Sequence, residues 1–202
     1  MHCLLLKKIT MVELTRVSSP SEIIGIRDLQ ELNLKQNITA EEAIDQGFLT
    51  AAYTIEFLQE MNSFSPSIIA KDGDKVVGYS LVSTKETKKG HDLIDSLFDA
   101  IDECVYNGVL LKDVNYVVVG QLCVAKEYRG QDLVQKLYGH FRDCLSHEYT
   151  YLVTDVAQAN VRSLKAHKKR GFQVINELMY GGFGWDIVLW DWNAADQRGY
   201  IF

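Results

Sequence analysis

The chain has 202 residues, of which 47% are hydrophobic and 24% charged, and it contains two prolines. This composition is that of a globular protein and excludes collagen-like, low-complexity and intrinsically disordered classes. With 27 acidic and 21 basic residues the net charge is −6, which argues against binding to nucleic acid or anionic membranes through overall positive charge.

The four cysteines show neither a CxxC pair nor a His/Cys cluster at zinc-binding spacing; they are Cys3, Cys104, Cys123 and Cys144. The sequence therefore predicts no disulfide framework and no metal site. The apolar run 4–6 is too short for a signal peptide, and no window reaches the roughly 18 apolar residues of a membrane span. We expect a cytoplasmic protein without a membrane partner, in which residues 1–10 are an extension and 11–202 a single domain.

The first third of the chain predicts one strand and then helices. Residues 12–17 have strand character, and Ser19 with Pro20 supplies the cap and first turn of the next helix. Thr39 and Glu42 have the spacing of a capping box, which predicts a short second helix. Apolar residues at spacing four, Tyr53, Phe57 and Met61, predict a third helix.

A hairpin, a helix and a buried strand are expected in the middle of the chain. Strands over 68–71 and 76–82 flank Asp72-Gly73-Asp74, a strong turn signal. Helical spacing over 93–105 predicts a helix that the pair Asn107-Gly108 closes. The apolar run 116–124 predicts a central strand with a bulge or close approach at its glycine.

The last third alternates helices and strands. The most regular apolar stripe runs from Leu133 to Leu145 and predicts a helix. A strand over 151–156 and a helix over 160–170 follow, and two closing strands are expected over 172–179 and 185–192. This alternation predicts one α/β domain with a mixed sheet.

The loop between the central strand and the long helix is a candidate anion site. Helix N-terminal amides bind phosphate, and Gly130 would let an anion approach the main chain. The plain structural alternative is that Gly130 makes a tight turn and Arg129 is a solvated surface charge.

A second pattern comprises Asn160, Ser163 and His167, followed by Gly171 and Phe172. Asn160 and His167 share a helix face about 10 Å long at 1.5 Å rise per residue, so one extended ligand could contact both. The structural alternatives are an N-cap for Asn160 and a hydrogen-bonded, half-buried side chain for His167.

In this order, the two patterns resemble the acetyl-CoA-binding core of the GNAT (Gcn5-related N-acetyltransferase) superfamily. The resemblance is strongest over 116–173 and extends in element order over nearly the whole chain. It implies a mixed, mostly antiparallel sheet flanked by helices, in which a parallel strand pair splays to hold CoA. The chain departs from the family pattern Gln/Arg-x-x-Gly-x-Gly/Ala with Glu127 at its first position and Asp132 at its last.

The resemblance implies acetyl transfer from acetyl-CoA to a primary amine of a small molecule or peptide. CoA phosphates would lie on the loop and first helical turn, and the pantetheine arm along the splayed strand and Asn160. The cofactor-binding residues expected on this basis are Leu122, Cys123, Val124, Arg129, Gly130, Gln131, Asp132, Leu133, Val134, Asn160 and Ser163.

His167 stands where the family usually has the tyrosine that protonates the departing thiolate, so the resemblance assigns it the acid role. For the base that deprotonates the amine, Glu56, Glu60, Asp155 and waters near Gln121 stay open as alternatives. Cys123 as an acyl-carrying nucleophile is a weaker hypothesis, because an apolar strand cysteine usually serves packing.

Charge distribution fits the same reading. Residues 121–171 hold nine basic against five acidic residues, which suits a polyanion such as CoA, whereas 31–65 hold six acidic against one basic residue and would favour a cationic amine. The rival hypotheses are a non-catalytic acyl-CoA sensor or partner-binding module and an acyltransferase for a longer chain or a hydroxyl acceptor. The chain is expected to be a monomer or homodimer, with Trp185, Trp190, Trp192, Tyr200 and Phe202 as core or interface.

Overall fold

The computed structural model describes residues 11–194. The extension expected at residues 1–10 and the aromatic residues Tyr200 and Phe202 lie outside the described residues. Between residues 11 and 194 no helix has both the length and the apolar character needed to cross a lipid bilayer.

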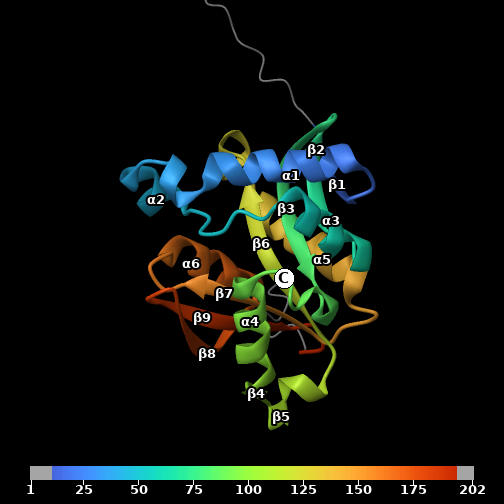
Figure 1. The fold of residues 1–202 in the computed structure, drawn as a ribbon, viewed down its shortest axis with the longest axis vertical. Coiled ribbons are helices and arrows are strands. Elements are labelled where there is room, and N and C mark those ends of the chain that lie inside the picture. Colours follow the sequence, from blue (N-terminus) through green and yellow to red (C-terminus); the bar gives the residue numbers. More distant parts are fainter. Residues whose placement is uncertain (1–10, 195–202) are drawn as a thin grey trace, which may run out of the picture.

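Seven strands form one sheet in the order β1-β2-β3-β6-β7-β9-β8 (Figure 1). Their bounds are β1 Glu13–Arg16, β2 Ile68–Asp72, β3 Lys75–Ser83, β6 Tyr116–Val124, β7 Tyr151–Ala157, β8 Gln173–Tyr180 and β9 Phe183–Asp191. Every neighbouring pair is antiparallel except β6 and β7, which are parallel. This confirms the predicted mixed, mostly antiparallel sheet.

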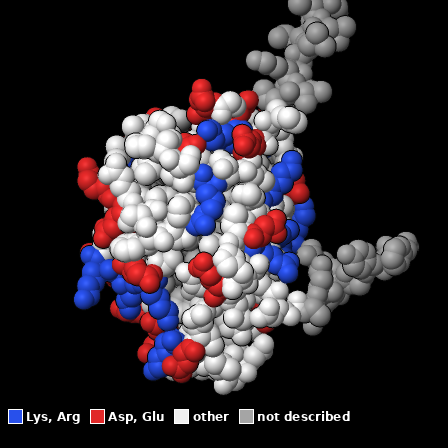
Figure 2. Space-filling view, turned by 90° about the vertical axis from the view of Figure 1, so that its right-hand side faces the viewer, with Lys and Arg blue, Asp and Glu red and all other residues white. Residues whose placement is uncertain are grey.

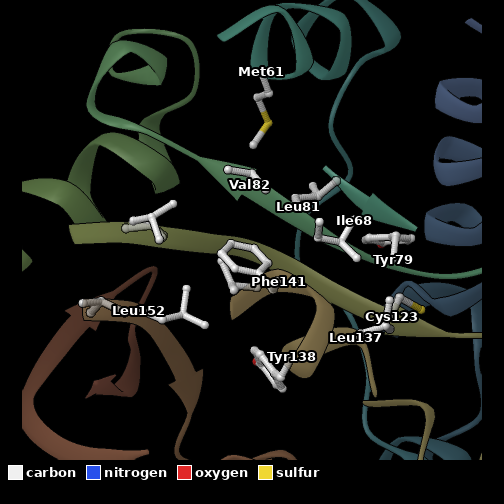
Figure 3. Close-up of a cluster of buried hydrophobic side chains, with 14 of the residues drawn as sticks. Met61, Ile68, Tyr79, Leu81, Val82, Cys123, Leu137, Tyr138, Phe141 and Leu152 are labelled. Carbon is white, nitrogen blue, oxygen red and sulfur yellow. The ribbon is translucent and has the colours of Figure 1, made fainter. Parts of the chain in front are cut away.

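Helices cover both faces of the sheet. The described part of the chain contains α1 Pro20–Asn33, α2 Ala40–Gln46, α3 Ile55–Phe64, α4 Asp92–Asp102, α5 Leu133–Leu145 and α6 Val161–Arg170. In Figure 1, α1 crosses in front of the sheet and α5 lies behind it. Figure 3 shows the same layers in the core, with Met61 of α3 on one side of the strands and Tyr138 and Phe141 of α5 on the other.

Local sequence signals explain most element boundaries. The apolar stripe and the central apolar run give α5 and β6 the predicted bounds. Thr39 caps α2 with the predicted capping box, and Asn160 caps α6, which ends at Gly171 in a left-handed conformation. The third helix begins later than predicted, because Thr54 is its N-cap and Tyr53 lies before it.

The segment after α4 corrects one expectation. The helix ends at Asp102, and 105–106 pairs with 109–110 as a two-stranded hairpin, β4 Val105–Tyr106 and β5 Val109–Leu110. Asn107 and Gly108 have φ angles of 51° and 79°. Two consecutive left-handed residues form the type I′ turn that matches strand twist, so Asn-Gly here turns a hairpin instead of closing a helix.

The sheet opens in its middle. Hydrogen-bonded register between β6 and β7 runs only from Tyr116/Tyr151 to Val118/Val153, and beyond that point the two strands diverge. Against β3, the register of β6 shifts between Leu122 and Val119, so Gly120 and Gln121 form the predicted bulge. An added Cβ at Gly120 would lie 3.3 Å from the Met61 methyl group, so α3 packs closely against the bulge.

Candidate active site

A cleft of about 470 Å³ lies where β6 and β7 diverge. Leu133 and Val134 of α5 line it on one face of the sheet. Tyr53, which precedes α3, and Leu93 of α4 line it on the other face. The cleft therefore passes between the strands. We call the end formed by α5 and α6 the donor end, and the end formed by Phe48, Tyr53, Leu93, Asp155 and Trp185 the acceptor end.

The exposed edge of β6 can bond an extended ligand. Ala125 N donates to Val77 O of β3 at 2.8 Å, and Cys123 is paired with Tyr79 in the same ladder. Because alternate residues of a strand direct their backbone groups to opposite edges, the amides of Leu122 and Val124 point into the splay. Of the three predicted strand contacts, Leu122 and Val124 can thus bond through the main chain, whereas Cys123 cannot.

The first turn of α5 presents amides at the donor end. Gly130 and Asp132 both have positive φ, 76° and 60°, and the side chain of the N-cap Asp132 makes no capping hydrogen bond. The first amides of a helix have no partner inside it, so those of α5 can receive an anion. The Asp132 carboxylate is exposed and lies 3.5 Å from Lys169 Nζ, which offsets its charge. Gln131 is exposed and does not line the cleft.

Arg129 lines the cleft, and its guanidinium is bonded to protein acceptors. Its Nε donates to Val124 O at 3.0 Å, and its Nη2 donates to Asn33 Oδ1 of α1. The guanidinium therefore joins the end of β6 to α1, and its role as a phosphate-binding side chain stays a prediction.

Asn160 and Ser163 lie at the start of α6, on the wall of the cleft. The Asn160 side chain accepts a hydrogen bond from Ser163 N at 3.1 Å, so it performs the capping function. An added Cβ at Gly47 would lie 3.2 Å from Asn160 Oδ1, and Gly47 has a φ of 76°. The segment after α2 therefore packs directly against Asn160 and covers part of its amide.

His167 is buried beside the donor end and is neutral near pH 7. Its Nδ1 is 2.8 Å from Ser163 O, and its Nε2 is 2.5 Å from the Tyr138 hydroxyl. A carbonyl only accepts, so Nδ1 carries the proton and Nε2 accepts from Tyr138. Burial lowers the pKa of His167 to about 4, although the bond to Ser163 opposes this. A neutral imidazole whose proton is bonded to a carbonyl is a poor proton donor, so this geometry argues against the predicted acid role.

Asp155 is the titratable group best placed for chemistry. It lines the cleft from β7, opposite Ile187 of β9, and its charge acts on the nearby Tyr53. Its Oδ2 is inaccessible to solvent and has no hydrogen-bond partner among the described residues. Burial raises the pKa of Asp155 from 3.8 to about 6. Such a carboxyl can take a proton near neutral pH, which supports it among the predicted bases.

A glutamine network that the sequence did not reveal fixes the bulge. Gln121 Nε2 donates to Ala51 O at 2.8 Å, while its Oε1 accepts from Tyr79 at 2.6 Å and from Gln30 at 2.8 Å. Tyr53 donates to Gly120 O at 3.3 Å beside it. The Gln121 amide thus bonds three protein groups and fixes the position of the bulge at the cleft wall. Only its polar character inside an apolar run could have signalled it.

The acidic side chains that the structure describes on α1, α2 and α3 do not line the cleft. Glu56 and Glu60 are exposed on α3 and do not line it. Glu31 bonds Arg27, and Glu42 bonds Lys126. Among the described residues that line the cleft, the acidic ones are Asp132 and Asp155. Of the acids counted over residues 31–65, Glu31 and Glu42 are thus paired with basic side chains, and Glu56 and Glu60 face solvent. On the face in Figure 2, basic and acidic residues are interspersed.

Cys123 remains a thiol. Its side chain is 6% exposed, and burial raises its pKa to about 12 against the smaller lowering effect of Arg129. The nucleophile is the thiolate, so this cysteine is unsuited to carry an acyl group.

Similarity to known proteins agrees with this geometry. The chain matches the acetyltransferase (GNAT) family model over residues 28–172, which is more than half of its length. No curated protein sequence is significantly similar to it.

Solved structures share the fold at low sequence identity. A GNAT-family acetyltransferase of Streptococcus agalactiae is 17% identical with a TM-score of 0.64, covering 89% of this chain and 95% of its own. The ribosomal-protein-S18-alanine N-acetyltransferase of Escherichia coli is 11% identical with a TM-score of 0.61, covering 94% and 99%. The protein yncA of Salmonella typhimurium, solved with its cofactor acetyl-CoA, is 12% identical with a TM-score of 0.58, covering 92% and 96%.

Proposed function

The chain belongs to the acetyltransferase (GNAT) family, and we propose that it transfers an acetyl group from acetyl-CoA directly to a primary amine. The observation that carries the proposal is the cleft between β6 and β7, which joins a helix N-terminus and an open strand edge to the half-buried carboxyl group of Asp155. Acetyl-CoA would supply the acyl group as an activated thioester.

The donor end has the groups that CoA requires. Amides of the first turn of α5, with the helix dipole behind them, suit the pyrophosphate, and Gly130 leaves the main chain open to it. The Leu122 and Val124 amides suit the amide groups of the pantetheine arm. An amide at this edge is also placed to stabilise negative charge that develops on a carbonyl oxygen.

The acceptor end has one group that can activate the amine. An alkyl ammonium must lose a proton before its nitrogen can attack, and Asp155 is a carboxyl with a pKa of about 6 and an unpartnered oxygen. Asp155 holds the ammonium and takes this proton, which then passes to solvent. When the neutral amine attacks the thioester, its nitrogen loses one further proton as the amide forms. The departing CoA thiolate takes up one proton, so the reaction balances.

His167 is a positioning residue in this scheme. Tyr138 and Ser163 hold its ring in one orientation, and its pKa of about 4 keeps it uncharged beside the donor end. The proposal therefore does not need a protonated imidazole.

Calorimetry with acetyl-CoA, followed by thiol release with a panel of primary amines, tests the proposal. Val134→Asp places a carboxylate in the first turn of α5 and should weaken acetyl-CoA binding at least tenfold. Val134→Asn, of the same shape but uncharged, is the matched control and should bind far more tightly than the aspartate variant.

The outcomes separate the alternatives. Binding with amine-dependent thiol release supports an N-acetyltransferase, and release with hydroxyl acceptors or longer acyl donors would redefine the reaction. Binding without release for any acceptor would point to the acyl-CoA sensor, and absence of binding would refute the proposal.

A further inference from the structure

The acceptor end contains a single carboxylate. Of the two acidic residues that line the cleft in the described part of the chain, Asp132 lies at the donor end beside Lys169, so Asp155 stands alone at the other. Because Asp155 lines the cleft, its carboxylate can pair with one ammonium group. A second cationic group in the same space would find no carboxylate.

Large aromatic and apolar side chains line the same end. Phe48, Tyr53, Leu93 and Trp185 surround this end. The polar atoms of two of them are already used: the Tyr53 hydroxyl donates to Gly120 O at 3.3 Å, and Trp185 Nε1 donates to Tyr180 O at 3.4 Å. These rings therefore offer hydrocarbon surface to an acceptor.

Two of these aromatic side chains, Tyr53 and Phe48, contact further residues of the protein. Tyr53 packs edge-on against His91, with ring centroids 4.9 Å apart. Lys35 Nζ lies 5.0 Å from the Phe48 ring centroid and 5.5 Å from that of Phe183, so a cation of the protein already occupies the outer position between those rings. That fixed positive charge opposes a second positive charge on the acceptor.

From this arrangement we infer that the acceptor is a monoamine with an apolar body, such as an alkylamine or an arylalkylamine, and that polycations such as polyamines and aminoglycosides are disfavoured. The inference rests on the proposed function and specifies its substrate class. A polycation would bury a second ammonium without a carboxylate partner against apolar side chains, which is unfavourable. The first ammonium avoids this desolvation cost because it pairs with Asp155.

Hexylamine and 1,6-diaminohexane provide the matched test, because they differ by one terminal amine on the same chain length. With saturating acetyl-CoA and the full chain, we expect kcat/KM for hexylamine to exceed that for the diamine at least tenfold. A Thr50→Asp variant adds a carboxylate at an exposed position of the cleft wall and should shrink this ratio severalfold. Thr50→Asn is its uncharged control and should leave the ratio unchanged.

A diamine turned over as well as or better than hexylamine would overturn this inference while leaving the acetyltransferase intact. A ratio that Thr50→Asp and Thr50→Asn change equally would overturn the electrostatic explanation. Absence of thiol release with every amine, in protein that binds acetyl-CoA, would instead remove the proposed function and this inference with it.

Discussion

Replacing Asp155 with asparagine should stabilise the protein and inactivate it at the same time. Burial raises the pKa of this carboxyl from 3.8 to about 6. A shift of about two pKa units corresponds to roughly 3 kcal/mol of preference for the neutral form, at 1.36 kcal/mol per unit. The neutral asparagine avoids that cost. Its buried amide lacks an acceptor, however, which reduces the gain in folding stability by about 1 kcal/mol.

The stability difference between Asp155→Asn and the parent protein depends on pH. The folded pKa lies above the unfolded one, so the carboxyl costs nothing when both states are protonated, and its full cost develops as pH rises through about 6. Urea unfolding should therefore show Asp155→Asn more stable than the parent by about 2 kcal/mol at pH 8, with most of this difference gone at pH 4. Exposed Asp143 on α5 gives the control, since Asp143→Asn should stay within about 0.5 kcal/mol at both pH values.

Activity should change in the opposite direction. The parent should lose kcat/KM as pH falls through about 6, because Asp155 acts as a base only when ionised. Asp155→Asn should lower turnover about 100-fold or more and abolish this acid limb, with acetyl-CoA binding retained. A variant with unchanged stability at pH 8 and an unchanged pH profile would refute the argument, since the carboxyl would then be neither desolvated nor the base.

Three further variants test other parts of the site. Asp132→Gly removes a carboxylate at the α5 N-cap and places glycine at a position with left-handed backbone conformation. Calorimetry should show acetyl-CoA binding several times tighter, and this gain in affinity should shrink at high salt. Arg129→Ala breaks the link to Asn33 and should lower the urea-unfolding free energy by about 1 to 3 kcal/mol; a purely salt-dependent loss of CoA affinity would instead restore the phosphate role. Tyr138→Phe leaves the buried His167 Nε2 unpaired and should cost about 1 to 3 kcal/mol of stability while turnover stays within a few-fold, whereas a 100-fold loss would make the hydroxyl catalytic.

Elements governed by local patterning were predictable from the sequence. The apolar patterns of α5 and β6 begin and end at the same residues as the observed helix and strand. Thr39 and Asn160 are the N-caps of α2 and α6, as predicted from their side chains. The helical spacing of residues 93–105 predicts that Asn107-Gly108 ends a helix, but the turn preference of this pair dominates locally. Its two positive φ angles require a hairpin.

The site was harder to predict because its groups are oriented by long-range contacts. Nothing near Arg129 in sequence indicates that Asn33, from α1, receives its guanidinium. The burial that lowers the pKa of His167 depends on Tyr138 and on the packing of α5 against α6. Asp155 was one of several possible bases, and only the splay of the strands singles it out.

The two ends of the cleft have separate origins in the chain. The donor end is built from one continuous stretch, β6 through α6. The acceptor end adds to Asp155 of β7 residues from three other segments: Phe48 and Tyr53 between α2 and α3, Leu93 of α4 and Trp185 of β9. Substitutions in those segments can reshape acceptor choice without disturbing the amides of α5. Under the proposed function, mutational drift or laboratory selection would therefore change which amines are accepted while acetyl-CoA binding stays intact.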